Sequence, residues 1–278
     1  MKTFLKSAFI SFIILSFACN KDNSSNIKPR GNENAFPVYN QAYQENYEED
    51  KIDDIIANAK NAYVLIDPFQ DNIASYIPEI KKNNNQVAGY ISIGTGEDWR
   101  SDFNQLIPYL VTKEWGQWEG EYFLKTITPE VVAIMKTRID SMAKWGCKWV
   151  EFDNMDWVFD DDYRSEYGIE ASPEQGIAYY NELADYLHKK GMKAMAKNTV
   201  EGTKDFDGVL YESYHKEKNW WDKKGTKQFL DEGKPVIINH YNEMDCDKVY
   251  IDYMDYYNQS ISYICEDANQ KKYVHYNE

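Results

Sequence analysis

Short apolar runs recur along the chain and alternate with longer segments in which apolar residues are spaced three and four apart. Runs of about four to eight apolar, β-branched and aromatic residues are typical of strands that are buried on both faces of a parallel sheet. The segments between them have the spacing of amphipathic helices. Expected strands occupy residues 62–67, 87–93, 121–124, 148–153, 192–196, 207–211, 235–239 and 260–264, with a ninth candidate at 37–39.

Two of the helical segments carry sequence signals at their ends. Thr128, followed by a proline, predicts the N-cap of one long helix, and Gly146 predicts its end. Ser172 and Gln175 have the spacing of a capping box at the start of a second helix. Strands that alternate with helices over this length predict an α/β fold, a (β/α)8 TIM barrel, in one domain of residues 37–278. The pattern leaves open which eight strands close the barrel.

Residues 1–18 predict a secretory signal, because two lysines precede an apolar stretch that ends at Ala18. The cysteine that follows resembles that of a bacterial lipoprotein signal, in which Cys19 becomes the lipidated first residue. Residues 19–36 then predict a flexible tether. We therefore expect an exported protein, anchored by lipid at a bacterial membrane or cell surface and touching the membrane only through that anchor. The alternative is a secreted protein in which Cys19 is incidental.

Charge and aromatic content narrow the class of partner. Acidic residues outnumber basic ones by 46 to 31, which gives a formal net charge of -15. This charge repels nucleic acid backbones, so no nucleic acid partner is expected. The 23 Tyr, 12 Phe and 8 Trp suit a cleft for sugars, whose C–H faces stack on rings, although aromatic residues also fill ordinary cores.

The cysteines and histidines do not suggest a zinc site. No CxxC or HExxH motif occurs, and four His are scattered along the chain, so no metal and no cofactor are expected. Cys147 precedes a predicted strand and is expected to be a buried thiol. Cys246 and Cys265 are able to pair in an oxidising compartment, but the sequence does not decide whether they do.

Charged and amide residues stand at the carboxyl ends of several predicted strands, where barrel enzymes carry their chemistry. Asp153 and Glu212 are the expected catalytic residues, because glycosidic cleavage needs one carboxyl group as acid and one as nucleophile or base. We expect Asp153 to be the nucleophile or base and Glu212 the acid, with the reverse assignment left open. The expected substrate-binding residues are Asp67, Tyr90, Glu97, Arg100, Asn154, Asp156, Lys197, Asn198 and Tyr241.

Two of these residues belong to a glycine-containing segment. Gly94 and Gly96 precede Glu97 and Arg100, and the segment is expected to be a loop that projects both charged residues over a cleft. The alternative is an ion pair in a surface loop. A dinucleotide-binding loop is excluded, because Trp99 stands where the third glycine would be needed.

Several blocks of the sequence together resemble glycoside hydrolase family 114, the endo-α-1,4-polygalactosaminidase-like proteins. The blocks are Gly89–Gly94 with Glu97 and Arg100, Arg138–Asp140, Glu151–Asp156, Lys197–Asn198, Asp207–Val209 with Glu212, and Gly233–Val236. The resemblance implies a (β/α)8 barrel with catalytic acids at the positions of Asp153 and Glu212. It also implies a polysaccharide or oligosaccharide substrate that contains galactosamine. An acidic protein would concentrate such a cationic polymer.

Three alternatives remain open from the sequence. The first is a surface lipoprotein that binds glycans on a barrel scaffold without cleaving them. The second is Schiff-base chemistry at Lys197. The third is a magnesium or calcium site built from Asp153, Asp156 and Glu212.

Overall fold

The computed structural model describes residues 35–43, 51–213, 225–241, 245–256, 261–267, 269 and 271–277. The chain divides into a unit of residues 1–31 and a unit from Asn32 to Glu278, and the described residues belong to the second. The expected signal peptide, Cys19 and nearly all of the tether lie outside the described residues. Within the described part of the chain, no helix has both the length and the apolar character needed to cross a membrane.

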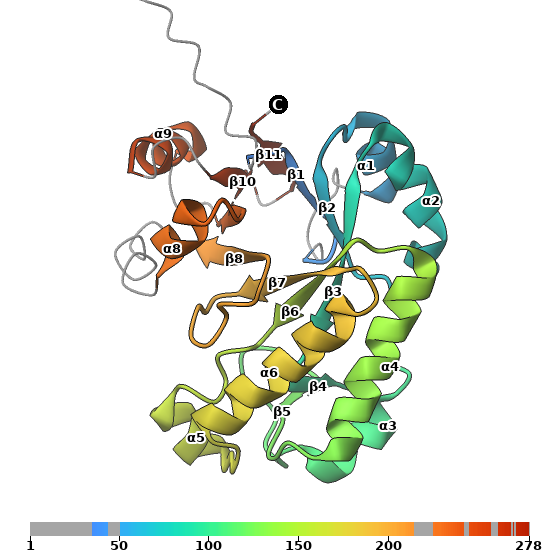
Figure 1. Cartoon of the computed structure of the whole chain (residues 1–278), viewed down its shortest axis with the longest axis vertical. Coiled ribbons are helices and arrows are strands. Elements are labelled where there is room, and N and C mark those ends of the chain that lie inside the picture. The colour runs from blue at the N-terminus through green and yellow to red at the C-terminus, as the bar shows by residue number, and fades with distance from the viewer. Residues whose placement is uncertain are drawn as a thin grey trace, which may run out of the picture. The chain divides into compact units, whose positions relative to one another are not determined.

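Among the described residues, nine strands form the main sheet, which curls into a barrel (Figure 1). Neighbouring strands are parallel except for the last pair, in which β11 is antiparallel to β10. In spatial order the strands are β1 (Val38–Asn40), β2 (Tyr63–Ile66), β3 (Gln86–Ser92), β6 (Trp149–Asp153), β7 (Lys193–Lys197), β8 (Gly208–Ser213), β9 (Val236–His240), β10 (Ser262–Glu266) and β11 (Tyr273–His275).

The two ends of the sheet meet, so that the barrel is nearly closed. The His275 ring on β11 stacks on Tyr39 of β1 with ring centroids 4.1 Å apart, and its Nδ1 lies 2.9 Å from the carbonyl oxygen of Val38. The backbone N–H of Phe36 donates to Ser262 Oγ at 3.0 Å. The expected TIM-barrel fold is confirmed, with β11 as an additional strand at the closure.

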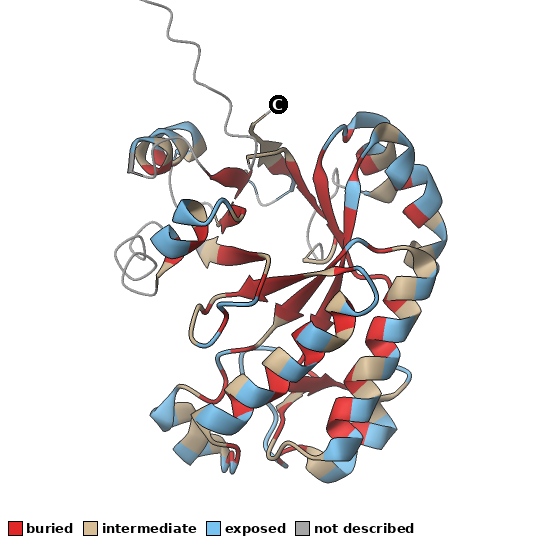
Figure 2. Ribbon diagram, viewed as in Figure 1, coloured by how far each residue is buried: buried red, intermediate tan, exposed pale blue. Residues whose placement is uncertain are grey.

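Helices cover the outside of the barrel (Figure 1). They present buried residues to the sheet and exposed residues outward, whereas the strands are buried almost throughout (Figure 2). The helices are α1 (Ile52–Asn58), α2 (Ile77–Ile80), α3 (Phe103–Leu106), α4 (Pro129–Trp145), α5 (Asp161–Tyr167), α6 (Pro173–His188), α8 (Thr226–Asp231) and α9 (Cys246–Tyr256). Short 3-10 helices occupy Ile73–Tyr76, Lys81–Asn83 and Ile107–Tyr109.

Alternate residues of each strand belong to two separate cores. Tyr90, Met195 and Leu210 pack together inside the barrel, whereas Val150 and Phe152 pack outward against the helices. Because side chains alternate along a strand, this arrangement fixes which polar residues at the strand ends face inward. Burial on both faces accounts for the nearly continuous apolar runs in the sequence.

The predicted helix ends are present. The hydroxyl of Thr128 accepts a hydrogen bond from the backbone of Val131, and α4 ends at Gly146 with φ of 94°. Ser172 and Gln175 form the reciprocal capping box at the start of α6. These caps satisfy backbone groups that have no partner within the helix.

Two strands differ from expectation in their place in the fold. Residues 121–124 do form a strand, β5 (Glu121–Phe123), but it pairs with β4 (Thr95–Glu97) in a separate antiparallel ribbon. The ninth candidate, at residues 37–39, instead supplies the first barrel strand. The ten residues that join β7 to β8 contain no helix, so one crossover of the barrel is shortened.

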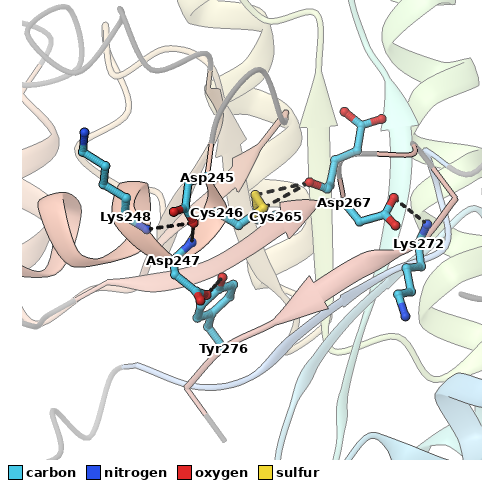
Figure 3. Close-up of a disulfide and its surroundings, with 9 residues drawn as sticks. Asp245, Cys246, Asp247, Lys248, Cys265, Asp267, Lys272 and Tyr276 are labelled. Atoms are coloured by element: carbon cyan, nitrogen blue, oxygen red, sulfur yellow. Dashed lines mark hydrogen bonds between the residues drawn. A yellow bond between two sulfur atoms is a disulfide. The ribbon is translucent and has the colours of Figure 1, made fainter.

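A disulfide joins Cys246, the first residue of α9, to Cys265 near the end of β10 (Figure 3). Tyr276 donates a hydrogen bond to Asp247 beside it at 2.7 Å. The pairing that the sequence left undecided is therefore made in the structure. Cys147 is a free, buried thiol, as expected.

Candidate active site

Three charged side chains meet at the carboxyl ends of adjacent strands. Asp153 ends β6, Lys197 ends β7 and Glu212 lies near the end of β8. The Lys197 ammonium lies 3.0 Å from Asp153 Oδ1 and 3.1 Å from Glu212 Oε2. The lysine side chain is only 4% exposed, whereas the aspartate is 13% and the glutamate 25% exposed. The two acids therefore reach solvent above a buried counter-charge.

The shared lysine limits how far apart the two acids are. Because both oxygens are hydrogen-bonded to the same nitrogen, they lie at most about 6 Å from each other. Glycosidases that retain anomeric configuration place their carboxyl groups about 5–5.5 Å apart, and inverting enzymes place them about 6.5–9.5 Å apart. The geometry therefore fits the closer, retaining arrangement.

Neutral donors hold each acid in place. Tyr90 donates to Asp153 Oδ2 at 2.9 Å, and Tyr241 donates to Glu212 Oε1 at 2.6 Å. The amide of Asn198 donates to Glu212 Oε2 at 3.0 Å, and its oxygen accepts from the backbone N–H of Glu212. The structure thus brings Tyr90, Asn198, Tyr241 and Lys197 to the two acids, whereas their expected role in binding substrate stays a prediction.

An asparagine with left-handed backbone dihedral angles follows Asp153 at the end of β6, and another follows Lys197 at the end of β7. Asn154 has φ of 54° and Asn198 has φ of 56°, a conformation that asparagine tolerates better than most residues. The Asn154 amide donates to Ser92 Oγ at 3.0 Å. Gly94 lies against this turn so closely that a Cβ there would be 2.0 Å from the Asn154 carbonyl oxygen. Asn154 therefore fixes the turn after the Asp153 strand.

Charge sets the protonation of the lysine and the glutamate. Burial acts to lower the pKa of Lys197, but the charges of Asp153 and Glu212 outweigh it and raise the pKa above its usual range. Burial acts to raise the pKa of Glu212, but Lys197, Tyr241 and Asn198 lower it below its usual value. A lysine that stays protonated is not a nucleophile, which argues against Schiff-base chemistry.

Three of the expected substrate-binding residues are instead buried against one another, which corrects that prediction. The Arg100 guanidinium donates to both carboxylate oxygens of Asp67 at 2.7 and 2.8 Å, and to both oxygens of Glu97 at 2.7 Å. The three side chains are 6%, 2% and 2% exposed. They are neither a charged loop over a cleft nor a surface ion pair, because Glu97 belongs to β4 and the network lies beneath the surface.

Asp156 is exposed at the start of the loop after β6 and makes no hydrogen bond to these acids among the described residues, although the charges of Asp153, Lys197 and Glu212 act on it. Among the described residues, no group of three or more His, Cys, Asp and Glu side chains is placed to hold a metal ion. Asp153 and Glu212 face a lysine, and a cation on a neighbouring side chain opposes the binding of a metal cation.

Comparison with known proteins places the chain in a family. The model of glycoside-hydrolase family GH114 matches residues 31–277. The chain belongs to family GH114. The family resemblance expected from the sequence is confirmed, and with it the class of enzyme, a glycoside hydrolase. An uncharacterized protein of Methanocaldococcus jannaschii is 27% identical over 183 residues, which span 62% of this GH114 chain and 50% of that protein.

Solved structures share the fold of this GH114 chain. Ega3 of Aspergillus fumigatus, in complex with galactosamine, superimposes with a TM-score of 0.66 at 22% identity, covering 88% of this chain and 95% of the other. The glycoside hydrolase domain of PelA from Pseudomonas aeruginosa gives 0.63 at 12% identity, covering 85% and 97%. An α-galactosidase of Thermus thermophilus gives 0.52 at 11% identity, covering 83% and 57%.

Sequence reasoning missed two residues that lie beside the candidate site. Glu151 faces the barrel interior two positions before Asp153, and Tyr43 follows β1 and donates a hydrogen bond to Glu151 Oε1. An acid within an apolar strand, on the same side of the strand as Asp153, was a usable signal. Tyr43 carried none, because it follows a strand of only three residues and no periodic pattern surrounds it.

A cavity of about 440 Å3 lies away from these acids, between α6, the β7–β8 connection and α8. Its lining includes Ile177, Val200, Thr203, Phe229 and Lys234. It occupies the side of the barrel where the connection from β7 to β8 lacks a helix. The candidate site is at the strand ends, because two carboxylates lie together there and glycosidic cleavage needs such a pair.

Proposed function

We propose that this GH114 chain hydrolyses glycosidic bonds in a galactosamine-containing polysaccharide, with Asp153 and Glu212 as its catalytic residues. The observation that carries the proposal is a pair of partly exposed carboxylates that share one buried lysine. The structural likeness to a protein solved with galactosamine supports the substrate class. The net charge of -15 agrees with it, because galactosamine that is not acetylated is cationic.

In the mechanism we favour, Glu212 is the nucleophile and Asp153 the acid, the reverse of the assignment first expected from the sequence. Three donors and the lowered pKa keep Glu212 ionised. Its oxygen forms a bond to the anomeric carbon while the bond to the leaving oxygen breaks and Asp153 gives that oxygen a proton. Water then attacks the same carbon, Asp153 takes its proton, and Glu212 leaves. The product keeps the anomeric configuration of the substrate.

The neutral residues around the acids orient them through this sequence. Tyr241 and Asn198 occupy both oxygens of Glu212, which aims the carboxylate without neutralising it. Tyr90 supports Asp153 on the side away from Lys197. Such donors cost no reorganisation during the reaction, because the fold has already placed them.

The test is release of reducing ends from polygalactosamine and from partly acetylated polymer by the wild type, Asp153→Asn and Glu212→Gln. We expect both variants to lose at least about a thousandfold in kcat while they still bind the polymer. Equal activity in all three proteins would remove these residues from the mechanism. Binding with no turnover by the wild type would support the alternative of a glycan-binding protein.

A leaving-group series separates the two roles. An aryl glycoside whose leaving group departs without protonation should give a rapid burst of released phenol with Asp153→Ala, because the first step no longer needs the acid, but no burst with Glu212→Ala. The opposite pattern would restore the first assignment. NMR of the first product formed from an α-linked substrate reports retention or inversion directly.

We further propose that the protein works outside the cytoplasm on a lipid anchor at Cys19. The Cys246–Cys265 disulfide supports an oxidising compartment. Cys19→Ser should move the protein from the membrane fraction to the soluble fraction. Recovery of that variant in the membrane fraction would refute the anchor.

A further inference from the structure

A third carboxyl group lies in the barrel interior beside the proposed catalytic pair. Glu151 is on β6, paired in register with Tyr90 of β3 and Met195 of β7. It is completely buried, and its Oε2 has no hydrogen-bond partner among the described residues. Glu151 also forms no ion pair within the described part of the chain. An ionised oxygen without a partner in such a place is much more costly than a neutral one.

Tyr43 joins this buried acid to the rest of the site. Its hydroxyl donates to Glu151 Oε1. The Lys197 ammonium lies 4.2 Å from the centroid of the Tyr43 ring, and the Tyr90 ring meets it edge-on at 6.1 Å. Lys197 and Tyr90 are in turn the side chains that bind the two oxygens of Asp153. One tyrosine therefore contacts the buried acid and both side-chain donors of the catalytic aspartate.

The number of negative charges around Lys197 depends on the state of Glu151. Two carboxylates already bind the ammonium directly, and an ionised Glu151 would place a third negative charge beside one positive charge in a buried volume. We propose that Glu151 and Tyr43 are positioning residues that act on hydrolysis through Lys197. While Glu151 is neutral, the ammonium serves the two catalytic acids alone. When Glu151 ionises, it competes for that charge and loosens both acids.

The surroundings of Glu151 agree with a neutral resting form. Burial raises the pKa of Glu151 to about 8, although Lys197 and the hydrogen bond from Tyr43 act in the opposite direction. The acid is therefore neutral below that pH and ionises as the pH rises through it. The titratable groups that face Glu151 are Tyr43, Tyr63, Tyr90, Asp153, Lys197 and Glu212.

The experiment is a pH profile of kcat on polygalactosamine for the full chain, so this inference rests on the proposed function. Wild-type kcat should fall as the pH rises through about 8. Glu151→Gln, a neutral mimic of the same shape, should stay within about threefold of wild type at pH 6 and lose that alkaline fall. Tyr43→Phe keeps the ring under Lys197 but removes the hydrogen bond, so its fall should move to higher pH. Glu79→Gln, an exposed acid on α2, is the control and should match the wild type.

Several outcomes would overturn the proposal. A loss of more than about tenfold in Glu151→Gln at pH 6 would mean that the ionised acid is needed. An alkaline fall that is unchanged in both Glu151→Gln and Tyr43→Phe would assign it to another group. A protonated carboxyl band in the wild-type infrared spectrum at pH 6, absent from Glu151→Gln, reports the neutral acid without any substrate. That band keeps failure of this inference separate from failure of the proposed function.

Discussion

Arg100→Met tests the buried network of Asp67, Glu97 and Arg100, three residues that the sequence predicted to bind substrate. The substitution keeps the length and apolar character of the side chain but removes the only charge that Asp67 pairs with among the described residues. Both carboxylates of the network are 2% exposed, so water cannot replace the guanidinium. Loss of one partner of a buried pair costs about 3–5 kcal/mol. Arg138, whose Nη1 lies 3.9 Å from Glu97, stays in place and favours the lower end of that range.

The loss of stability in Arg100→Met should depend on pH, because Asp67 and Glu97 can take up protons when the guanidinium is removed. Without the guanidinium, burial raises the folded-state pKa of Glu97 further above its ordinary value of 4.5, because desolvation already raises it in the wild type. An acid whose pKa is higher in the folded than in the unfolded state favours folding at low pH, and this contribution to stability is lost as the pH rises. Protonating an acid of pKa 4.5 costs about 3.4 kcal/mol at pH 7 but about 0.7 kcal/mol at pH 5. The deficit of the variant should therefore shrink to about 2 kcal/mol or less at pH 5.

The assay is urea unfolding of wild type and Arg100→Met at pH 7 and pH 5. At pH 7 we also expect a Tm about 10 °C lower, from about 2–4 °C for each kcal/mol in a chain of this size. Lys227→Met is the matched control, because its pair with Asp231 is exposed and should contribute less than about 0.5 kcal/mol. A loss below about 1 kcal/mol in Arg100→Met, or a loss that is larger at pH 5 than at pH 7, would refute the reasoning.

Three further changes test other parts of the structure. Replacing Cys246 and Cys265 by serine should cost about 3 kcal/mol, measured by urea unfolding with and without reductant, because the disulfide closes a sequence separation of 19 residues; equal stability would argue against the bond. Lys197→Met should lower kcat at least about a hundredfold with intact folding by circular dichroism, since the two acids lose their shared counter-charge. Tyr241→Phe should raise the pKa of Glu212, which moves the acidic limb of the kcat/KM profile to higher pH; an unmoved limb would exclude a role for that bond.

The barrel was predictable from sequence because most of its strands are buried on both faces. Segments such as 62–67 and 235–239 are continuous apolar runs, and capping signals at Thr128 and Ser172 mark the long helices between strands. The strands at the closure were less predictable. β1 has three residues and includes Asn40, so residues 37–39 were only a ninth candidate, and β11, also of three residues, was not predicted. Their pairing across the whole chain fixes them instead.

The placement of the candidate site residues was predictable where strand direction alone decides it, and not where tertiary burial does. Asp153, Lys197 and Glu212 follow apolar runs, and parallel strands deliver such residues to one rim. The segment from Gly94 to Arg100, with its glycines and charged residues, has the composition of a loop that binds ligand. The burial of Glu97 and Arg100 depends on the β4–β5 ribbon and on Asp67 from a distant strand, which no local pattern reports. The contact of Tyr43 with Glu151 in the barrel interior likewise depends on tertiary packing that no local pattern reports.

Strand order explains why the lysine is essential to the spacing of the acids. β7 lies between β6 and β8, so Asp153 and Glu212 belong to strands that are two positions apart in the sheet. With about 4.8 Å between neighbouring strands, their backbones are separated by about 10 Å, and like charges would hold the carboxylates apart. Lys197 stands on the strand between them and binds one oxygen of each, which brings those oxygens within about 6 Å. In the proposed mechanism, retention of configuration would therefore depend on Lys197, a residue that never touches the bond being broken.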